Sequence, residues 1–157
     1  LTTPFMLATT LGFGSIALLL TLVIQAAIFY FGALMLGGQE MRFGDMFTMS
    51  LWARLPMALG LLVLTGFTLI TGRFIQYPGL AILFASGDPM ADAANPLLPL
   101  LSGVDLFWIW SLFLLVVGVA VVSGLSRGKA LLLVLVYAAL ALGLTVLPTL
   151  LFSGFRG

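Results

Sequence analysis

The sequence predicts an all-α membrane protein with four membrane-spanning helices. Two observations carry this prediction: the excess of apolar over charged residues, and long uncharged runs separated by polar turns. The 157 residues are 62% hydrophobic and 7% charged, whereas a soluble domain carries roughly 25% charged residues. Six basic and five acidic side chains cannot cover a domain of this size with groups that water solvates, so lipid must surround most of the surface.

The first predicted span covers residues 10–36 and contains no charge. About 27 residues at 1.5 Å each extend about 40 Å, which exceeds the roughly 30 Å hydrocarbon core. This span must therefore tilt, protrude or start later, and Gly12 and Gly14 offer a break near its start. The loop at residues 37–44 is glycine-rich and mixed in charge, which is typical of a tight turn at the membrane surface.

The second predicted span covers residues 45–71 and contains Pro56, which removes a backbone donor and obstructs the preceding turn. Two models are open. In the first, one kinked helix forms the whole span. In the second, residues 43–53 lie at the membrane interface and the span begins near Pro56. That span would hold only about 16 residues, which is short for a membrane, so we favour the kinked helix.

A long non-cytoplasmic connection follows at residues 72–103. It holds four of the seven prolines and is too apolar for plain disorder, whereas loops longer than about 15 residues are usually functional or disordered. We expect a short helix from Gln76 to Ala85 that lies on the membrane and ends at the turn formed by residues 86–89.

The third and fourth predicted spans cover residues 104–125 and 129–152. Asp105 stands at the start of the third span, where a helix dipole favours negative charge. Arg127 and Lys129 follow the end of that span, where positive charge is favoured. The turn between the two spans is short and rich in serine and glycine, so the spans are expected to be antiparallel neighbours.

The basic residues predict the orientation. Arg42, Arg54, Arg127 and Lys129 fall on one side, and only Arg73 and Arg156 on the other. By the positive-inside rule the loops at 37–44 and 125–129 are cytoplasmic. Because the chain begins with leucine rather than methionine, we expect a fragment of a longer protein. Its four spans would then be spans two to five of a five-span bundle.

Arg54 is the most unusual charge, because it lies about 13 Å into the second span. One interpretation is a buried charge that pairs with a partner or lines a polar pathway. The other, which we favour from the sequence, is a long side chain that reaches back to the cytoplasmic headgroups.

The remaining candidate sites are weaker. Asp105 is either a proton-carrying or partner-binding carboxylate or, as we favour, a residue that caps the helix start. Glu40, Arg42 and Asp45 form either a cytoplasmic partner site or a solvated turn, and the turn is favoured. Two small-xxx-small patterns run from Ala120 to Gly124 and from Ala139 to Gly143. Such patterns let helices approach closely. We favour packing within the chain over a homo-oligomer face for both.

Several kinds of site have no residues to build them. The chain has no cysteine and no histidine, so thiol chemistry and the commonest general base, metal ligand and haem ligand are missing. A net charge of +1 argues against a nucleic-acid partner, because phosphate binding needs clustered basic residues. We therefore expect no catalytic, cofactor or metal site, and a protein that meets the lipid bilayer and other membrane subunits.

The last two predicted spans resemble the bacterial branch of the Yip domain family, the Ypt/Rab-interacting protein family. That branch has a similar aspartate–aromatic stretch, a glycine within the span and a short basic turn, which here are Asp105-Leu-Phe-Trp-Ile-Trp110-Ser-Leu, Gly118 and Ser123-Gly-Leu-Ser-Arg-Gly-Lys129-Ala130. Gly37-Gly38 followed by Phe43, and Leu55-Pro56 in the next span, also fit. The resemblance covers roughly residues 20–150 and departs at the connection that follows Thr71.

The resemblance implies five spans, a cytoplasmic N-terminus and no catalytic residues. Eukaryotic members of the family associate with Rab GTPases, a role that is not transferred to a bacterial-looking sequence. Some bacterial members look like accessory partners of ABC-type exporters. The sequence therefore favours a non-catalytic scaffold or accessory subunit in a bacterial inner membrane. The alternatives are a small transporter or channel, or a structural subunit of a respiratory or photosynthetic complex.

Overall fold

The structure of the protein is a computed structural model that describes residues 3–93, 95 and 97–153; Arg156 lies outside them. Within those residues every regular element is a helix, so the all-α prediction is confirmed. Four stretches are long and apolar enough to cross a membrane, as predicted, and they are Ala8–Met35, Phe43–Thr71, Leu106–Ser123 and Arg127–Thr145. The helices α1 (Thr3–Met35), α6 (Leu106–Ser123) and α7 (Arg127–Ser153) each supply one of these stretches.

Helix α1 is continuous through Gly12 and Gly14, so the expected break near its start is wrong. A Cβ atom added to either glycine would meet nothing within 4 Å, so neither marks a turn or a close contact. A helix in lipid keeps its backbone hydrogen bonds because no water replaces them, and a lone glycine costs only about 1 kcal/mol. That cost is too small to interrupt α1.

The second predicted span consists of two helices, α2 (Phe43–Trp52) and α3 (Leu55–Thr71). They are joined by a turn at Ala53 and Arg54. Pro56 lies in the first turn of α3, where a missing backbone donor does no harm. The Ser111 hydroxyl of α6 donates a hydrogen bond of 2.6 Å to the Ala53 carbonyl. The proline thus sets the start of α3, and a neighbouring helix satisfies the carbonyl at the turn.

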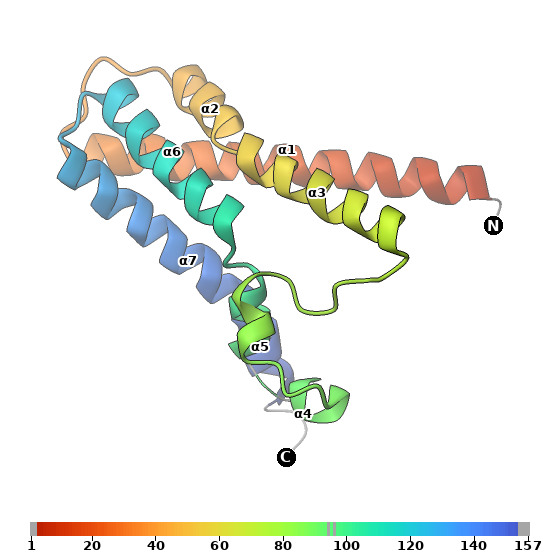
Figure 1. The fold of residues 1–157 in the computed structure, drawn as a ribbon. Coiled ribbons are helices and arrows are strands. Elements are labelled where there is room, and N and C mark those ends of the chain that lie inside the picture. The colour runs from red at the N-terminus through yellow and green to blue at the C-terminus, as the bar shows by residue number, and fades with distance from the viewer. Residues whose placement is uncertain (1–2, 94, 96, 154–157) are drawn as a thin grey trace.

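The helices form two arms that meet at one end of the molecule (Figure 1). Helices α1, α2 and α3 make one arm, and α6 and α7 make the other. The core lies where the arms meet, with buried apolar side chains from α1, α2, α6 and α7. Its largest fully buried members are Phe29, Leu22, Met46, Leu115 and Val119.

Glycines let the arms approach closely at three places, of which two lie in the core and the third is Gly60 of α3 against Phe107 of α6. A Cβ on Gly118 of α6 would lie 2.4 Å from Cγ of Met49 on α2. A Cβ on Gly32 of α1 would lie equally close to the Leu133 side chain of α7. The predicted small-xxx-small patterns do not make such contacts, because Gly124 is the left-handed C-cap of α6 and a Cβ on Gly143 would meet nothing within 4 Å. Ala120 of the first pattern is nevertheless partly buried and packs against the core, whereas Ala139 and Gly143 of the second pattern are exposed. The expectation of packing within the chain is therefore confirmed for Ala120 and wrong for the second pattern.

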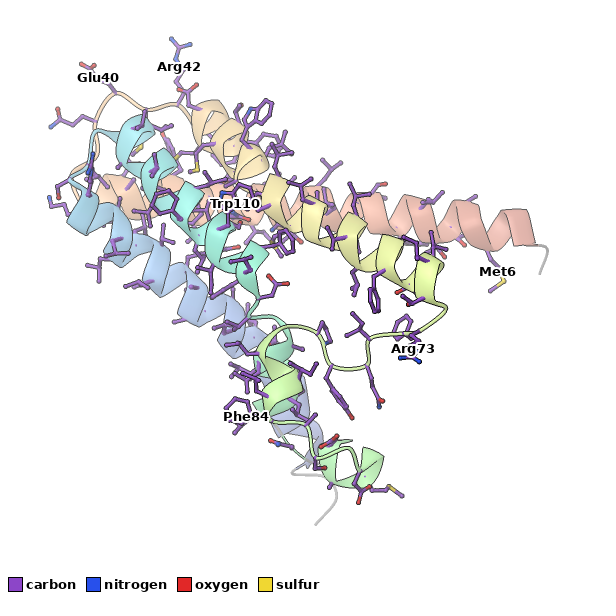
Figure 2. All side chains as sticks on the ribbon, in the orientation of Figure 1. Met6, Glu40, Arg42, Arg73, Phe84 and Trp110 are labelled. Atoms are coloured by element: carbon purple, nitrogen blue, oxygen red, sulfur yellow. The ribbon has the colours of Figure 1, made fainter. Side chains whose placement is uncertain are left out.

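The two short loops lie together where the arms meet. The Gln39 amide donates to the Ser123 carbonyl at 3.3 Å. Lys129 Nζ donates to the Leu36 carbonyl, just past the end of α1, at 2.7 Å, where a helix dipole favours positive charge. In Figure 2, Glu40 and Arg42 project away from the helices at this end.

The connection from α3 to α6 is built of short pieces: the 3₁₀-helix η1 (Gly79–Leu83), α4 (Pro89–Ala93) and α5 (Leu97–Ser102). The expected helix at 76–85 is therefore wrong in length and type. Gly79 has φ +64°, and a Cβ there would lie 2.7 Å from the Val104 carbonyl. The Leu80 amide donates to the same carbonyl at 3.0 Å. This docking against residues 101–104 holds the segment in a tighter 3₁₀ turn.

Asp92 organises the outer part of the connection. Its side chain is buried and accepts hydrogen bonds from the Ser86 amide at 2.8 Å, the Ser86 hydroxyl at 2.7 Å and the Gly87 amide at 3.3 Å. These bonds, led by the one from the Ser86 backbone, hold the pKa of Asp92 below its usual value. The sequence indicated only a turn here, because nothing local marks this aspartate as the acceptor.

Candidate functional site

Four polar side chains from four separate segments converge at the turn between α2 and α3. They are Gln25 of α1, Arg54 of the turn, Ser111 of α6 and Tyr137 of α7, and we call this group the polar junction. Gln25 and Ser111 are buried, and Arg54 is partly buried. The junction ties both arms together at the level where the second span is broken.

Arg54 is the centre of the junction. Its Nε and Nη2 atoms donate to Gln25 Oε1 at 3.1 and 2.8 Å. The Tyr137 hydroxyl also interacts with the guanidinium, and the Tyr137 ring packs on Phe29 with centroids 4.9 Å apart. Arg54 thus turns inward to α1 and α7, so the interpretation that it reaches back to the headgroups is wrong.

The hydrogen-bond partners of the guanidinium, Gln25 and Tyr137, are neutral. Among the residues that the structure describes, no carboxylate lies within ion-pair distance of it. An arginine at the centre of a membrane helix costs about 2.5–3.5 kcal/mol on insertion scales, and hydrogen bonds to a charged group return about 1.5–3 kcal/mol. Neutral acceptors therefore offset much of the cost but leave the charge without a counter-ion.

The other predicted site residues are not brought together with Arg54 as one polar cluster. Asp105 is the N-cap of α6, and its Oδ1 accepts the Trp108 amide at 2.7 Å. Asp45 lies in the first turn of α2 and accepts the Arg42 amide at 3.3 Å. Glu40, beside them in sequence, is exposed and has φ +53°.

The two predicted basic residues of the third loop differ in their roles. Lys129 binds the end of α1 as described above, whereas Arg127 is the first residue of α7 and is exposed. They lie with Arg42 at the end where the arms meet, while Arg54 lies deeper. The structure therefore divides the predicted residues into a basic end and a separate, internal charge.

Sequence reasoning missed most of the junction. Gln25 was visible only as a polar residue within an uncharged span, and nothing distinguished Ser111 or Tyr137 from other polar residues in the spans. The available signal was the coincidence of one glutamine and one arginine in adjacent spans, since a buried charge needs hydrogen-bond partners. Ser50, near the junction in α2, is fully buried and its hydroxyl has no partner.

An open cavity of about 860 Å³ adjoins the polar junction. Its lining comes from α3, from residues 75–82 of the connection that follows α3, and from residues 102–108 at the start of α6. Most of its lining is apolar, with Leu18 of α1 and a row of α3 side chains on one side. Arg54 and Asp105 are the charged residues in the lining.

A family model for the Yip1 domain matches residues 1–149. The chain belongs to the Yip1 domain family. The resemblance drawn from the Asp105–Ala130 block is thereby confirmed for the family. No curated protein and no solved structure matches this chain.

This Yip1 domain is an integral membrane protein, with four helices able to cross a bilayer. Across the described residues, no group of three His, Cys, Asp or Glu side chains is placed to hold a metal ion. The polar junction can bind an anion or hold helices in register, but it offers no nucleophile paired with a base.

Proposed function

We propose that this Yip1 domain is a non-catalytic scaffold or accessory subunit that holds another membrane subunit against the N-terminal part of α1. The observation that carries the proposal is the packing of α1. None of its described side chains before Leu22 is buried, although α1 is well packed from Leu22 onward. The N-terminal part thus offers an exposed membrane-helix surface.

The composition of that surface supports a helix partner rather than lipid alone. Within residues 8–15, every position except Leu11 and Phe13 is alanine, threonine, glycine or serine. Small residues at one level of a membrane helix let a second helix approach closely, which is the main source of helix association in lipid. A Cβ on Gly12 or Gly14 would meet nothing within 4 Å, so there is room for a second helix beside these two glycines.

The finer form of the proposal is an ABC-type export system in a bacterial cytoplasmic membrane. It rests on the resemblance of the Asp105–Ala130 block to bacterial members that look like exporter accessories.

A transporter or channel is the alternative, and a flux assay in liposomes tests it. The polar side chains of the junction gather at one level instead of forming a line along the spans, which favours the scaffold. A subunit of a respiratory or photosynthetic complex is the third alternative. It would purify with cofactor-containing subunits, which an absorption spectrum detects.

Photo-crosslinking from α1 tests the scaffold. With a photoreactive phenylalanine analogue at Phe13, we expect an adduct of defined mass with a second membrane subunit in native membranes. The same analogue at Leu132, which is exposed on α7, should give no such adduct. Lipid adducts alone from both positions would contradict the proposal, and an adduct of twice the chain mass would indicate a homo-oligomer instead. ATP-binding-cassette subunits among the adducts would support the export system.

We also propose that the end where the arms meet is cytoplasmic, because Arg42, Arg127 and Lys129 lie there. The chain has no cysteine, so single cysteines report on sidedness without background. We expect Glu40→Cys to react with a membrane-impermeant maleimide only in inverted vesicles, and Met90→Cys only in intact cells whose outer membrane is permeabilised. Labelling in the reverse pattern would invert the proposed orientation.

A further inference from the structure

We propose that the cavity beside α3 binds an anionic amphiphile, with its acidic head on Arg54 and its apolar chain along α3. This inference goes beyond the scaffold role and does not depend on it. The head is an oxyacid, either the carboxylate of a fatty acid or the phosphate of a phospholipid.

The acidic head follows from the donors that Arg54 has left. A guanidinium carries five N–H donors. Gln25 accepts from Nε and Nη2 through a single neutral oxygen, and the neutral Tyr137 hydroxyl is the other partner. Further donors and the whole positive charge remain at the edge of the cavity that Arg54 lines. Planar, bidentate binding of a carboxylate or phosphate is the recognition that a guanidinium performs best.

Asp105 does not supply the missing counter-charge. It lies six residues before Ser111 on α6, and Ser111 contacts Ala53 beside Arg54, so Asp105 is about 9 Å further along the helix. Its carboxylate accepts the Trp108 amide at the N-terminus of α6. The helix dipole there already favours a negative charge, so Arg54 stays uncompensated.

The apolar chain follows from the walls of the cavity. Beyond Arg54, the lining on α3 is formed by aliphatic and aromatic side chains; among them are Met57, Leu61, Leu64 and Phe67. Opposite them, Phe107 of α6 lies against Gly60, where an added Cβ would come 2.7 Å from its ring. The volume of about 860 Å³ falls within the roughly 300–1,000 Å³ of small-molecule sites. The lining is apolar apart from Arg54 at one edge and Asp105, whose carboxylate accepts the Trp108 amide at the start of α6. A cationic group beside a mostly apolar cavity matches an anionic amphiphile better than a polar solute.

The experiment uses Trp108, which lines the cavity, as a fluorescent reporter. Trp52→Phe and Trp110→Phe remove the other two tryptophans of the chain. The purified protein in detergent is titrated with 9,10-dibromostearate and with the alcohol and the amine that have the same dibrominated chain. The bromine atoms of all three compounds quench tryptophan fluorescence. We expect saturable quenching by the carboxylate with an apparent Kd at least about tenfold below that of the alcohol, the ratio given by one charge-assisted hydrogen bond. Equal Kd values for acid and alcohol, or tighter binding of the amine, would overturn the proposal.

Variants separate the head from the chain. Arg54→Gln should remove the preference for the acid, and Arg54→Lys should keep most of it. Ala58→Phe fills the cavity and should weaken quenching by acid and alcohol alike. Because this change leaves the polar junction intact, it also tests the proposal if Arg54→Gln fails to fold. Leu62→Phe, on the same helix but outside the lining, is the control and should change nothing. If Ala58→Phe leaves the titration unaltered, the chain does not lie in this cavity and the proposal is wrong.

A second pair of titrations identifies the source of the anionic head. Brominated phosphatidylglycerol and brominated phosphatidylcholine are compared in lipid nanodiscs. Stronger quenching by phosphatidylglycerol would assign a phosphate-headed lipid, whereas quenching by dibromostearate alone would assign a free fatty acid. No anion preference in either series would overturn the proposal.

Discussion

Replacing Gly118 with leucine should separate α2 from α6 and destabilise the protein by about 1–3 kcal/mol, the usual cost of overpacking. The cause is the contact with Met49, because even a Cβ at position 118 would lie 2.4 Å from Cγ and 2.9 Å from the sulfur of that side chain. Leucine adds three further carbons in the same direction. Thermal unfolding in one detergent, followed by circular dichroism, measures the loss as a lower Tm.

The matched control is Gly66→Leu in α3, where a Cβ would meet nothing within 4 Å. Its Tm should equal or exceed that of the wild type, because leucine favours helix over glycine by about 1 kcal/mol. Adding Met49→Ala to Gly118→Leu should restore part of the lost stability, since the smaller side chain makes room. Equal losses from Gly118→Leu and Gly66→Leu would contradict the close packing of α2 on α6.

Hydrophobic content and the positions of charges were enough to predict the membrane helices, because lipid leaves a chain few alternatives to the helix. The start of α6 at Leu106 follows from Asp105, whose side chain caps the helix. The break at Ala53 and Arg54 was only half predicted. Pro56 indicated either a kink or a helix start, and the kinked helix was favoured, because local sequence cannot show that Ser111 of a distant span accommodates the turn.

Tertiary packing was the part that the sequence could not supply. Gly118, Gly32 and Gly60 make the close contacts. In the more regular small-xxx-small patterns Gly124 ends a helix and Gly143 is exposed. Which face of a span points inward depends on its rotation, and the spans are too uniformly apolar for a hydrophobic face to show it. The same uniformity hid the partner of Arg54. A headgroup contact and an inward contact with Gln25 are both consistent with the sequence, and only the packing of α1 beside the turn decides between them.

Replacing Gln25 with leucine should also destabilise the protein, by about 1–3 kcal/mol, because it removes the acceptor of two hydrogen bonds and leaves a charge without that partner. Arg54→Leu alone leaves the buried Gln25 amide without its donor but also removes the charge, so its cost should be smaller. The double variant, with leucine at both positions, should be at least as stable as Gln25→Leu, since two apolar groups can replace a buried polar pair at little cost.

This order of stabilities is the signature of a buried charge held by a neutral acceptor. The Tm values of the four proteins form a double-mutant cycle, in which a coupling of about 0.5–3 kcal/mol is expected for residues in contact. The exposed Arg42, replaced by leucine together with Gln25, provides a cycle in which the two changes should be additive. If the effects of Gln25→Leu and Arg54→Leu are also additive, Gln25 does not hold the guanidinium. The interpretation in which the Arg54 side chain reaches the headgroups would then be favoured again.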